Sequence, residues 1–157
     1  MDLIIKKTKI TEAKRLLEIQ KEAFREDLEK YQDYETSPVN EKIDRLLSKI
    51  THFHHYTIWL NGEIIGGIDI RDLGKGKYRL NRIFIANQHQ NKGLGSEIMQ
   101  LIEAEYPNAL EWSLDTPHLN IRNHYFYEKL GFVKIGENKV TDKLILYVYK
   151  KTLKMAD

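Results

Sequence analysis

The chain is 157 residues long, and its 25 Lys and Arg against 23 Asp and Glu give a formal net charge of +2. That length predicts one domain, residues 1–157, and the absence of cysteine excludes disulfides, thiolate metal ligands and cysteine nucleophiles. No apolar run approaches the roughly 20 residues of a membrane span, no signal peptide opens the chain, and the basic excess is too small to indicate nucleic-acid binding, so we expect a soluble, cytoplasmic protein.

The N-terminal half predicts a strand, two helices and a hairpin. Residues 3–8 predict the first strand, and Thr11 is expected to cap a helix whose apolar side chains follow a helical spacing. A second helix is expected over residues 39–50. The period then changes to two, and Asn61-Gly62 predicts a tight hairpin turn, since both turn residues must adopt positive φ. The expected hairpin strands are residues 55–60 and 63–72.

The C-terminal half alternates strands and helices and ends in two strands. Gly131 stands where the end of the last helix favours a left-handed residue. The resulting order, β-α-α-β-β-β-α-β-α-β-β, predicts an α/β (α+β) fold with a mixed sheet flanked by helices. The expected elements are strands over residues 78–86, 109–115, 132–136 and 144–149, and helices over residues 95–106 and 120–130.

A loop with two glycines, Gly93 and Gly95, joins the strand expected over residues 78–86 to the helix expected over residues 95–106. The first turn of a helix has N–H groups without intrahelical acceptors and a partial positive charge. Glycines let an anion approach that backbone closely, so the loop suits a pyrophosphate, with Lys92 and Arg82 as added charge nearby. The alternative is a plain strand-to-helix turn. A Rossmann loop is excluded because its third glycine is missing, and a Walker loop is excluded because no Gly-Lys-Ser/Thr follows.

A second segment carries Asn120 and, seven residues later, Tyr127. Two helical turns separate them, so they lie on nearly the same helix face. Asn120 is expected either to cap the helix or to face a ligand. A tyrosine hydroxyl there can donate a proton to a leaving group, or it can be a buried aromatic with one hydrogen bond.

Together these segments resemble the GNAT superfamily of N-acetyltransferases. Gln90-Asn91-Lys92-Gly93-Leu94-Gly95 matches the superfamily's [Gln/Arg]-x-x-Gly-x-[Gly/Ala] loop, and Asn120 with Tyr127-Glu128-Lys129-Leu130-Gly131-Phe132 matches its second motif. The element order agrees across nearly the whole chain. The resemblance implies a GNAT-like, mostly antiparallel twisted sheet. It also implies acetyl-CoA as the co-substrate for transfer of an acetyl group to a primary amine of a small molecule or a protein.

The resemblance also implies roles for individual residues. Tyr127 would protonate the departing thiolate of coenzyme A, and Asn120 would contact the cofactor near its thioester. The backbone of one strand would hold the pantetheine arm, and the loop would hold the pyrophosphate. The strand residues are Ile83, Phe84 and Ile85; the loop residues are Gln90 and the N–H groups of Asn91, Lys92, Gly93, Leu94, Gly95 and Ser96.

The reaction also needs a base, because an alkylammonium with a pKa of about 10.4 must lose a proton before it attacks. Asp115, five residues before Asn120, stands where some relatives carry a glutamate base. It is shorter by one methylene and would act through a water. His118 and a water chain are alternatives, and Asp115 could equally be a loop cap.

Three expectations concern what else the protein binds. His52-Phe53-His54-His55 lacks a clear third ligand, so we expect no metal site. Acids and tyrosines over residues 26–35 would suit a cationic amine, or they form a solvated helix end. A homodimer is implied by the resemblance alone. The alternative to an enzyme is a non-catalytic acyl-CoA-binding sensor or interaction module on the same fold.

Overall fold

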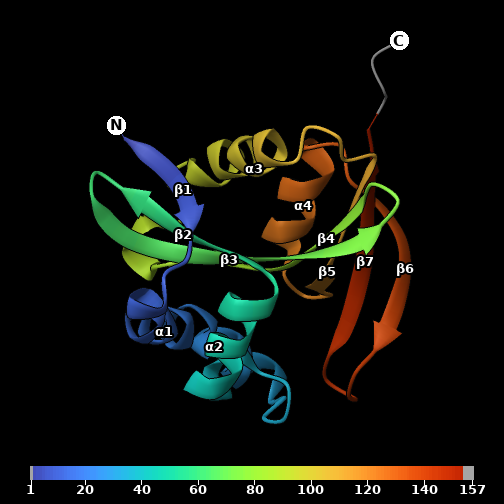
Figure 1. Ribbon diagram of the computed structural model, residues 1–157. Helices are drawn as coiled ribbons and strands as arrows, with labels where there is room; N and C mark the ends of the chain where they lie inside the picture. Colours follow the sequence, from blue (N-terminus) through green and yellow to red (C-terminus); the bar gives the residue numbers. More distant parts are fainter. Residues whose placement is uncertain (1, 154–157) are drawn as a thin grey trace. The chain divides into compact units, whose positions relative to one another are not determined.

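The computed structural model describes residues 2–153 (Figure 1). Helices and strands follow the predicted order, which confirms the mixed α/β fold. The sheet has seven strands in the order β1-β2-β3-β4-β5-β7-β6. The bounds are β1 Leu3–Lys7, α1 Ala13–Tyr31, α2 Ile43–His52, β2 His54–Leu60, β3 Glu63–Gly74, β4 Lys77–Ile85, α3 Leu94–Glu105, β5 Glu111–Pro117, α4 Ile121–Lys129, β6 Val133–Lys139 and β7 Ile145–Thr152.

The chain forms two compact units, each made of two stretches of sequence. The first unit comprises the chain up to Ile70 together with Arg82–Pro107. The second comprises Arg71–Asn81 together with the chain from Asn108 onward. The boundaries fall inside β3 and β4, so the turn end of this hairpin belongs to the second unit and its other end to the first.

The first unit is built on antiparallel strands with helices on both faces. β1 pairs with β2 from Leu3↔Leu60 to Lys7↔Tyr56, and β2 pairs with β3. Asn61 (φ 50°) and Gly62 (φ 82°) form the predicted hairpin turn between them. In Figure 1, α1 and α2 lie together on one side of these strands and α3 lies on the other.

The core of the first unit lies between α1, α2 and the end of β4. The helical spacing of the apolar residues turns one face of α1 inward, and that face packs on Phe84. Phe84 is fixed by two glycines of β3. A Cβ on Gly66 would overlap the Phe84 carbonyl oxygen, and one on Gly67 would lie 2.7 Å from its ring. The buried members of the cluster are Ala13, Leu16, Ile19, Leu46, Phe84 and Ala86.

Both N-terminal helices begin later than predicted. Thr11 does not cap α1, because Ile10–Glu12 forms a 3-10 turn in which Glu12 accepts a hydrogen bond from the Lys9 N–H (3.0 Å). Pro38–Asn40 forms a second 3-10 turn, capped by Ser37 Oγ. The next residue, Glu41, is extended and buried, so α2 starts at Ile43.

The second unit places β7 between β5 and β6. β7 pairs antiparallel with both of these strands, while β4 pairs parallel with β5 over Lys77–Arg79 and Glu111–Ser113. Trp112 is buried, with its ring 5.4 Å from that of Tyr78. Gly131 (φ 99°) follows α4 in the left-handed conformation, as predicted.

Candidate functional site

In the first unit, the loop after β4 leads into an uncapped helix N-terminus. Asn91 (φ 61°) and Gly93 (φ 77°) are both left-handed, and Gly93 is the N-cap of α3. No side chain caps this helix, and in the described part of the chain the N–H groups of residues 92–96 find no acceptor outside it. A Cβ on Gly93 would meet no atom within 4 Å. The glycine therefore serves the backbone conformation, and the space above it is open.

The other predicted cradle residues divide into those that hold the loop and those that face outward. The Gln90 amide donates hydrogen bonds to the Ile85 carbonyl (2.9 Å) and to Asn87 Oδ1 (3.2 Å), so it fastens the loop to the end of β4. Leu94 is buried, whereas Lys92 and Ser96 are exposed. The chain thus offers backbone donors and one cation at this end of α3, the combination that binds phosphate groups.

In the second unit, α4 carries the other predicted pair. Asn120 is the N-cap residue, and its carbonyl accepts from the N–H groups of Asn123 (3.0 Å) and His124 (3.2 Å). Its side chain does not cap the helix. Tyr127 is buried, with its ring 5.1 Å from that of Phe126 and 5.6 Å from that of Phe132. Burial raises the pKa of the Tyr127 hydroxyl to about 12, so it remains protonated at neutral pH.

Asp115 lies on β5 of the second unit in a two-point ion pair. Its Oδ1 and Oδ2 accept from Nη1 and Nη2 of Arg79 at 3.2 and 3.1 Å. Each carboxylate oxygen has a second lone pair beyond that contact. For His118, Nδ1 accepts a hydrogen bond from the Ile145 N–H (3.1 Å). The same Nδ1 lies 3.2 Å from the Ile145 carbonyl oxygen, so the Ile145 backbone can bond this nitrogen in either tautomer of the ring.

Sequence reasoning missed a buried charge network in the first unit. Glu41 binds Lys49 Nζ with Oε1 (2.7 Å), and with Oε2 it accepts from Arg82 Nη1 (2.5 Å) and Gln20 Nε2 (2.6 Å). Arg82 is therefore an ion-pair partner of Glu41, whereas the sequence suggested it as an added cation near the loop with Gly93. The four residues of the network come from different elements, so no local pattern predicted that they would meet. The strand gave no separate signal either, since β4 also carries Lys77, Arg79 and Asn81.

The charges of this network affect one another. Burial opposes ionisation of Glu41, but the hydrogen bond from Lys49 and the charge of Arg82 outweigh it and hold the pKa of the carboxyl below its ordinary value. Burial, together with the charge of Arg82, lowers the pKa of Lys49 against the opposing pull of Glu41. The network thus favours the ionised form of Glu41, whose Oε2 holds the Arg82 guanidinium.

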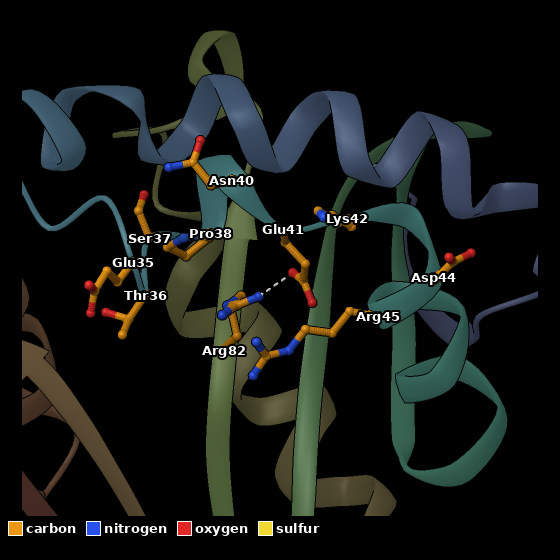
Figure 2. A pocket seen from close by; sticks show the side chains of 10 residues that line it. All are labelled: Glu35, Thr36, Ser37, Pro38, Asn40, Glu41, Lys42, Asp44, Arg45 and Arg82. Carbon is orange, nitrogen blue, oxygen red and sulfur yellow. Dashed lines mark hydrogen bonds and ion pairs between the residues drawn. The ribbon is translucent and has the colours of Figure 1, made fainter.

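A pocket of about 420 Å³ opens beside this network (Figure 2). Its lining comes from the α1–α2 connection, the start of α2 and Arg82 of β4. The acids and tyrosines expected there contribute little, because Tyr31 and Asp33 are buried and Asp33 accepts hydrogen bonds from Thr36. Of the predicted acids, Glu35 lines the pocket.

The histidines that sequence analysis considered for a metal have separate surroundings. His52 ends α2 and is exposed, while the ring of His54 lies 5.9 Å from that of Tyr106. His55 is buried and bonds Thr8 Oγ1 through Nδ1 (2.7 Å). Within residues 2–153, no three His, Asp or Glu side chains are grouped to hold a metal ion. No helix in that range has the length and hydropathy of a membrane span.

The arrangement of elements is shared with solved N-acetyltransferases. PaiA N-acetyltransferase of Thermoplasma acidophilum, in complex with coenzyme A, matches with a TM-score of 0.78 and 18% identity over 98% of this chain and 100% of its own. The ribosomal-protein-S18-alanine N-acetyltransferase of Escherichia coli matches with a TM-score of 0.79 and 15% identity, over 99% of this chain and 97% of its own. A GNAT family acetyltransferase of Elizabethkingia anophelis with acetyl-CoA bound matches with a TM-score of 0.63 and 17% identity, over 73% of this chain and 85% of its own. At these identities the likeness defines the fold.

The sequence itself places the chain in a family. The acetyltransferase (GNAT) family model matches residues 13–132, which is more than half of the chain. The chain belongs to the acetyltransferase (GNAT) family, as its two motifs predicted. A curated relative, the uncharacterized protein YrkN of Bacillus subtilis (strain 168), is 30% identical over 79 residues. That match spans 49% of this chain and 43% of the relative, less than half the relative's length.

Proposed function

We propose that this protein is an N-acetyltransferase that moves an acetyl group from acetyl-CoA to a primary amine of a small molecule or a protein. The observation that carries the proposal is the uncapped N-terminus of α3 behind two left-handed residues, in a chain of this family. The open space above Gly93 and the exposed Lys92 fit a pyrophosphate. We propose the whole chain as one acetyltransferase domain, cytoplasmic, with homodimer formation as a further expectation.

In the first unit, the proposed task is to bind the donor. Residues 91–96 direct backbone N–H groups at the pyrophosphate, where the helix dipole adds attraction, and Gln90 holds the loop in place. The backbone of Ile83, Phe84 and Ile85 bonds the amide groups of the pantetheine arm. Phe84 is suited to this because Gly66 and Gly67 of the neighbouring strand leave room for its backbone and ring to pack closely.

In the second unit, the proposed task is proton transfer. The neutral amine attacks the thioester carbonyl, the carbon–sulfur bond breaks, and the Tyr127 hydroxyl donates its proton to the departing sulfur. The proton that the attacking nitrogen then loses restores the hydroxyl. A thiol has a pKa near 8.5, so the leaving group needs only modest help from a hydroxyl whose pKa is about 12. Asn120 contacts the donor near the thioester.

The ammonium form of the acceptor must first lose a proton, and we propose Asp115 as the base, acting through a water. Arg79 holds both carboxylate oxygens and so orients the group while leaving each a free lone pair. His118 is the alternative candidate, and its Nδ1 contacts the Ile145 backbone.

Calorimetric titration with acetyl-CoA tests the proposal, comparing the wild type with Gly93→Asp. We expect the wild type to bind and the variant to lose binding, since a carboxylate would occupy the anion site. Gly62→Asp is the matched control, because Gly62 (φ 82°) is also left-handed with no atom within 4 Å of a Cβ. It introduces the same strain and charge in a hairpin turn. Absence of acetyl-CoA binding by the wild type would overturn the proposal.

Turnover is then measured as thiol release with polyamines, aminoglycosides and peptide amines. Release that depends on an amine supports acetyl transfer. Binding of acetyl-CoA without release by any amine would instead indicate an acyl-CoA-binding module.

A further inference from the structure

The pocket beside β4 contains guanidinium nitrogens without acceptors. Arg82 donates from Nη1 to Glu41, and within the described residues its other nitrogens donate to no partner. Arg45 of α2 also lines the pocket, and its guanidinium makes no ion pair with any described residue. In Figure 2 the Arg45 side chain extends toward Arg82. Two such groups at one cavity offer several N–H donors to a single oxyanion.

Arg82 is held rigidly, which distinguishes it from a mobile surface cation. Its partner Glu41 is itself fixed from two further sides, by Lys49 at 2.7 Å and by Gln20 at 2.6 Å. The Glu41 side chain is only 3% exposed and that of Arg82 19%. A binding group whose own position is fixed by buried partners loses little conformational entropy when a ligand arrives.

The acids of the pocket leave a net positive charge around the two arginines. Glu41 pairs with Arg82 but also with Lys49, so these three charges sum to +1. In Figure 2 the Asp44 carboxylate points away from the two guanidinium groups, and Glu35 lies at the end of the view opposite Asp44. Both residues are exposed, so water screens their charge. Ser37 adds a donor, since its oxygen accepts from the Val39 N–H and its own O–H is left to donate.

We propose that this pocket binds a carboxylate group of the acceptor, so that the amines acetylated by this protein carry a carboxylate. The assignment rests on the proposed function, because it names the acceptor of that reaction. Arg82 immediately precedes Ile83, where the strand segment proposed for the pantetheine arm begins. A volume of about 420 Å³ suits a molecule of amino-acid size.

Arginine side-chain NMR tests the pocket without any turnover. The Nε–H signals of Arg45 and Arg82 are followed while N-acetylglycine, N-acetylglycinamide or inorganic phosphate is added at matched ionic strength. We expect N-acetylglycine to shift both signals and the amide, which lacks the charge, to shift neither. Equal effects of acid and amide, no effect of the acid, or a stronger effect of phosphate would each overturn the carboxylate assignment.

Variants assign the effect to the pocket. Arg45→Gln should weaken the affinity for N-acetylglycine about tenfold, since it removes one charged donor group. Arg82→Lys should weaken it as well while preserving a cation for Glu41. Arg25→Gln, which removes an exposed arginine of α1, should leave the affinity unchanged. Equal affinity in Arg45→Gln and Arg25→Gln would contradict the proposal.

The two proposals fail in different ways. Acetyl-CoA binding without a response to N-acetylglycine would reject the carboxylate pocket and leave the acetyltransferase proposal standing. A response to N-acetylglycine without acetyl-CoA binding would reject the acetyltransferase, and with it the acceptor assignment. In thiol release, amino acids should exceed their amides as acceptors, and amides that equal or exceed the acids would also reject the carboxylate assignment.

Discussion

At the scale of the single residue, burial widens the pH range over which the Tyr127 hydroxyl keeps its proton. With the pKa raised to about 12, the hydroxyl carries its proton throughout the neutral range. We expect Tyr127→Phe to lower kcat about 100-fold, the lower range for loss of a general acid, without changing acetyl-CoA affinity. Thiol release and calorimetry measure the two quantities.

Tyr125→Phe provides the control, because Tyr125 lies on the same helix and is 76% exposed. It should retain wild-type turnover. Full activity of Tyr127→Phe would show that the thiolate leaves without help from this hydroxyl.

His55 makes the stability of the fold depend on pH. Burial, opposed by the charge of Asp69, lowers the pKa of His55 to about 4 from an ordinary 6.5. Between these values the unfolded chain binds the proton and the folded chain does not, so stability is lost as the pH falls from about 6.5 to 4. The full difference corresponds to about 3 kcal/mol.

His55→Gln should remove this loss while offering Thr8 an amide partner. We expect urea unfolding at pH 7 and at pH 4.5 to show a smaller difference in unfolding free energy for His55→Gln than for the wild type. His52→Gln, at an exposed position, should behave as the wild type does. An unchanged pH dependence in His55→Gln would contradict the assignment to this ring.

At the scale of elements, the Arg79–Asp115 pair joins the parallel strands β4 and β5. The side chains are 30% and 17% exposed, so the pair is partly screened by solvent. We expect Asp115→Asn and Arg79→Gln each to lower the free energy of unfolding by about 1 kcal/mol, measured by urea titration.

Turnover distinguishes a catalytic role of Asp115 from a purely structural role in its ion pair with Arg79. If Asp115 is the base, Asp115→Asn should lower kcat at least about 100-fold, while Arg79→Gln keeps the carboxylate and loses much less. Equal losses in the two variants would reduce Asp115 to a structural partner of Arg79.

The sequence predicted the elements whose signals are local. Asn61-Gly62 and Gly131 specify left-handed turns by themselves, and the order of helices and strands followed from periodicity. Thr11 misled because it lies inside the 3-10 turn Ile10–Glu12, where the Glu12 side chain accepts from the Lys9 N–H. Glu41 and Arg82 lie 41 residues apart, and no periodicity connects them. Partners distant in sequence require the tertiary fold, which also decides which cations face the pocket.

At the scale of the whole molecule, ligand binding should appear as thermal stabilisation. A ligand that binds only the folded chain, present at about 100 times its Kd, adds about 2.7 kcal/mol. For a chain of this size we expect acetyl-CoA to raise Tm by about 5–10 °C at that ratio. Differential scanning calorimetry measures the shift.

The glycine variants separate strain from binding in the same measurement. Gly93→Asp and Gly62→Asp should both lower Tm without ligand, because a side chain at φ near +80° costs about 1–2 kcal/mol. Only Gly62→Asp should regain stability when acetyl-CoA is added. Recovery in both variants would place the donor away from Gly93.

The position of β7 has a consequence for how the chain is made. β5 and β6 leave the ribosome first, yet neither pairs with the other, since each forms its antiparallel ladder with Ile145–Thr152. Until that segment emerges, both strands have unpaired edges, and the half of the protein that carries Tyr127 has no continuous sheet. The nascent chain is thus exposed to aggregation late in synthesis, and a stop codon shortly before residue 145 would leave two strands without the partner that both need.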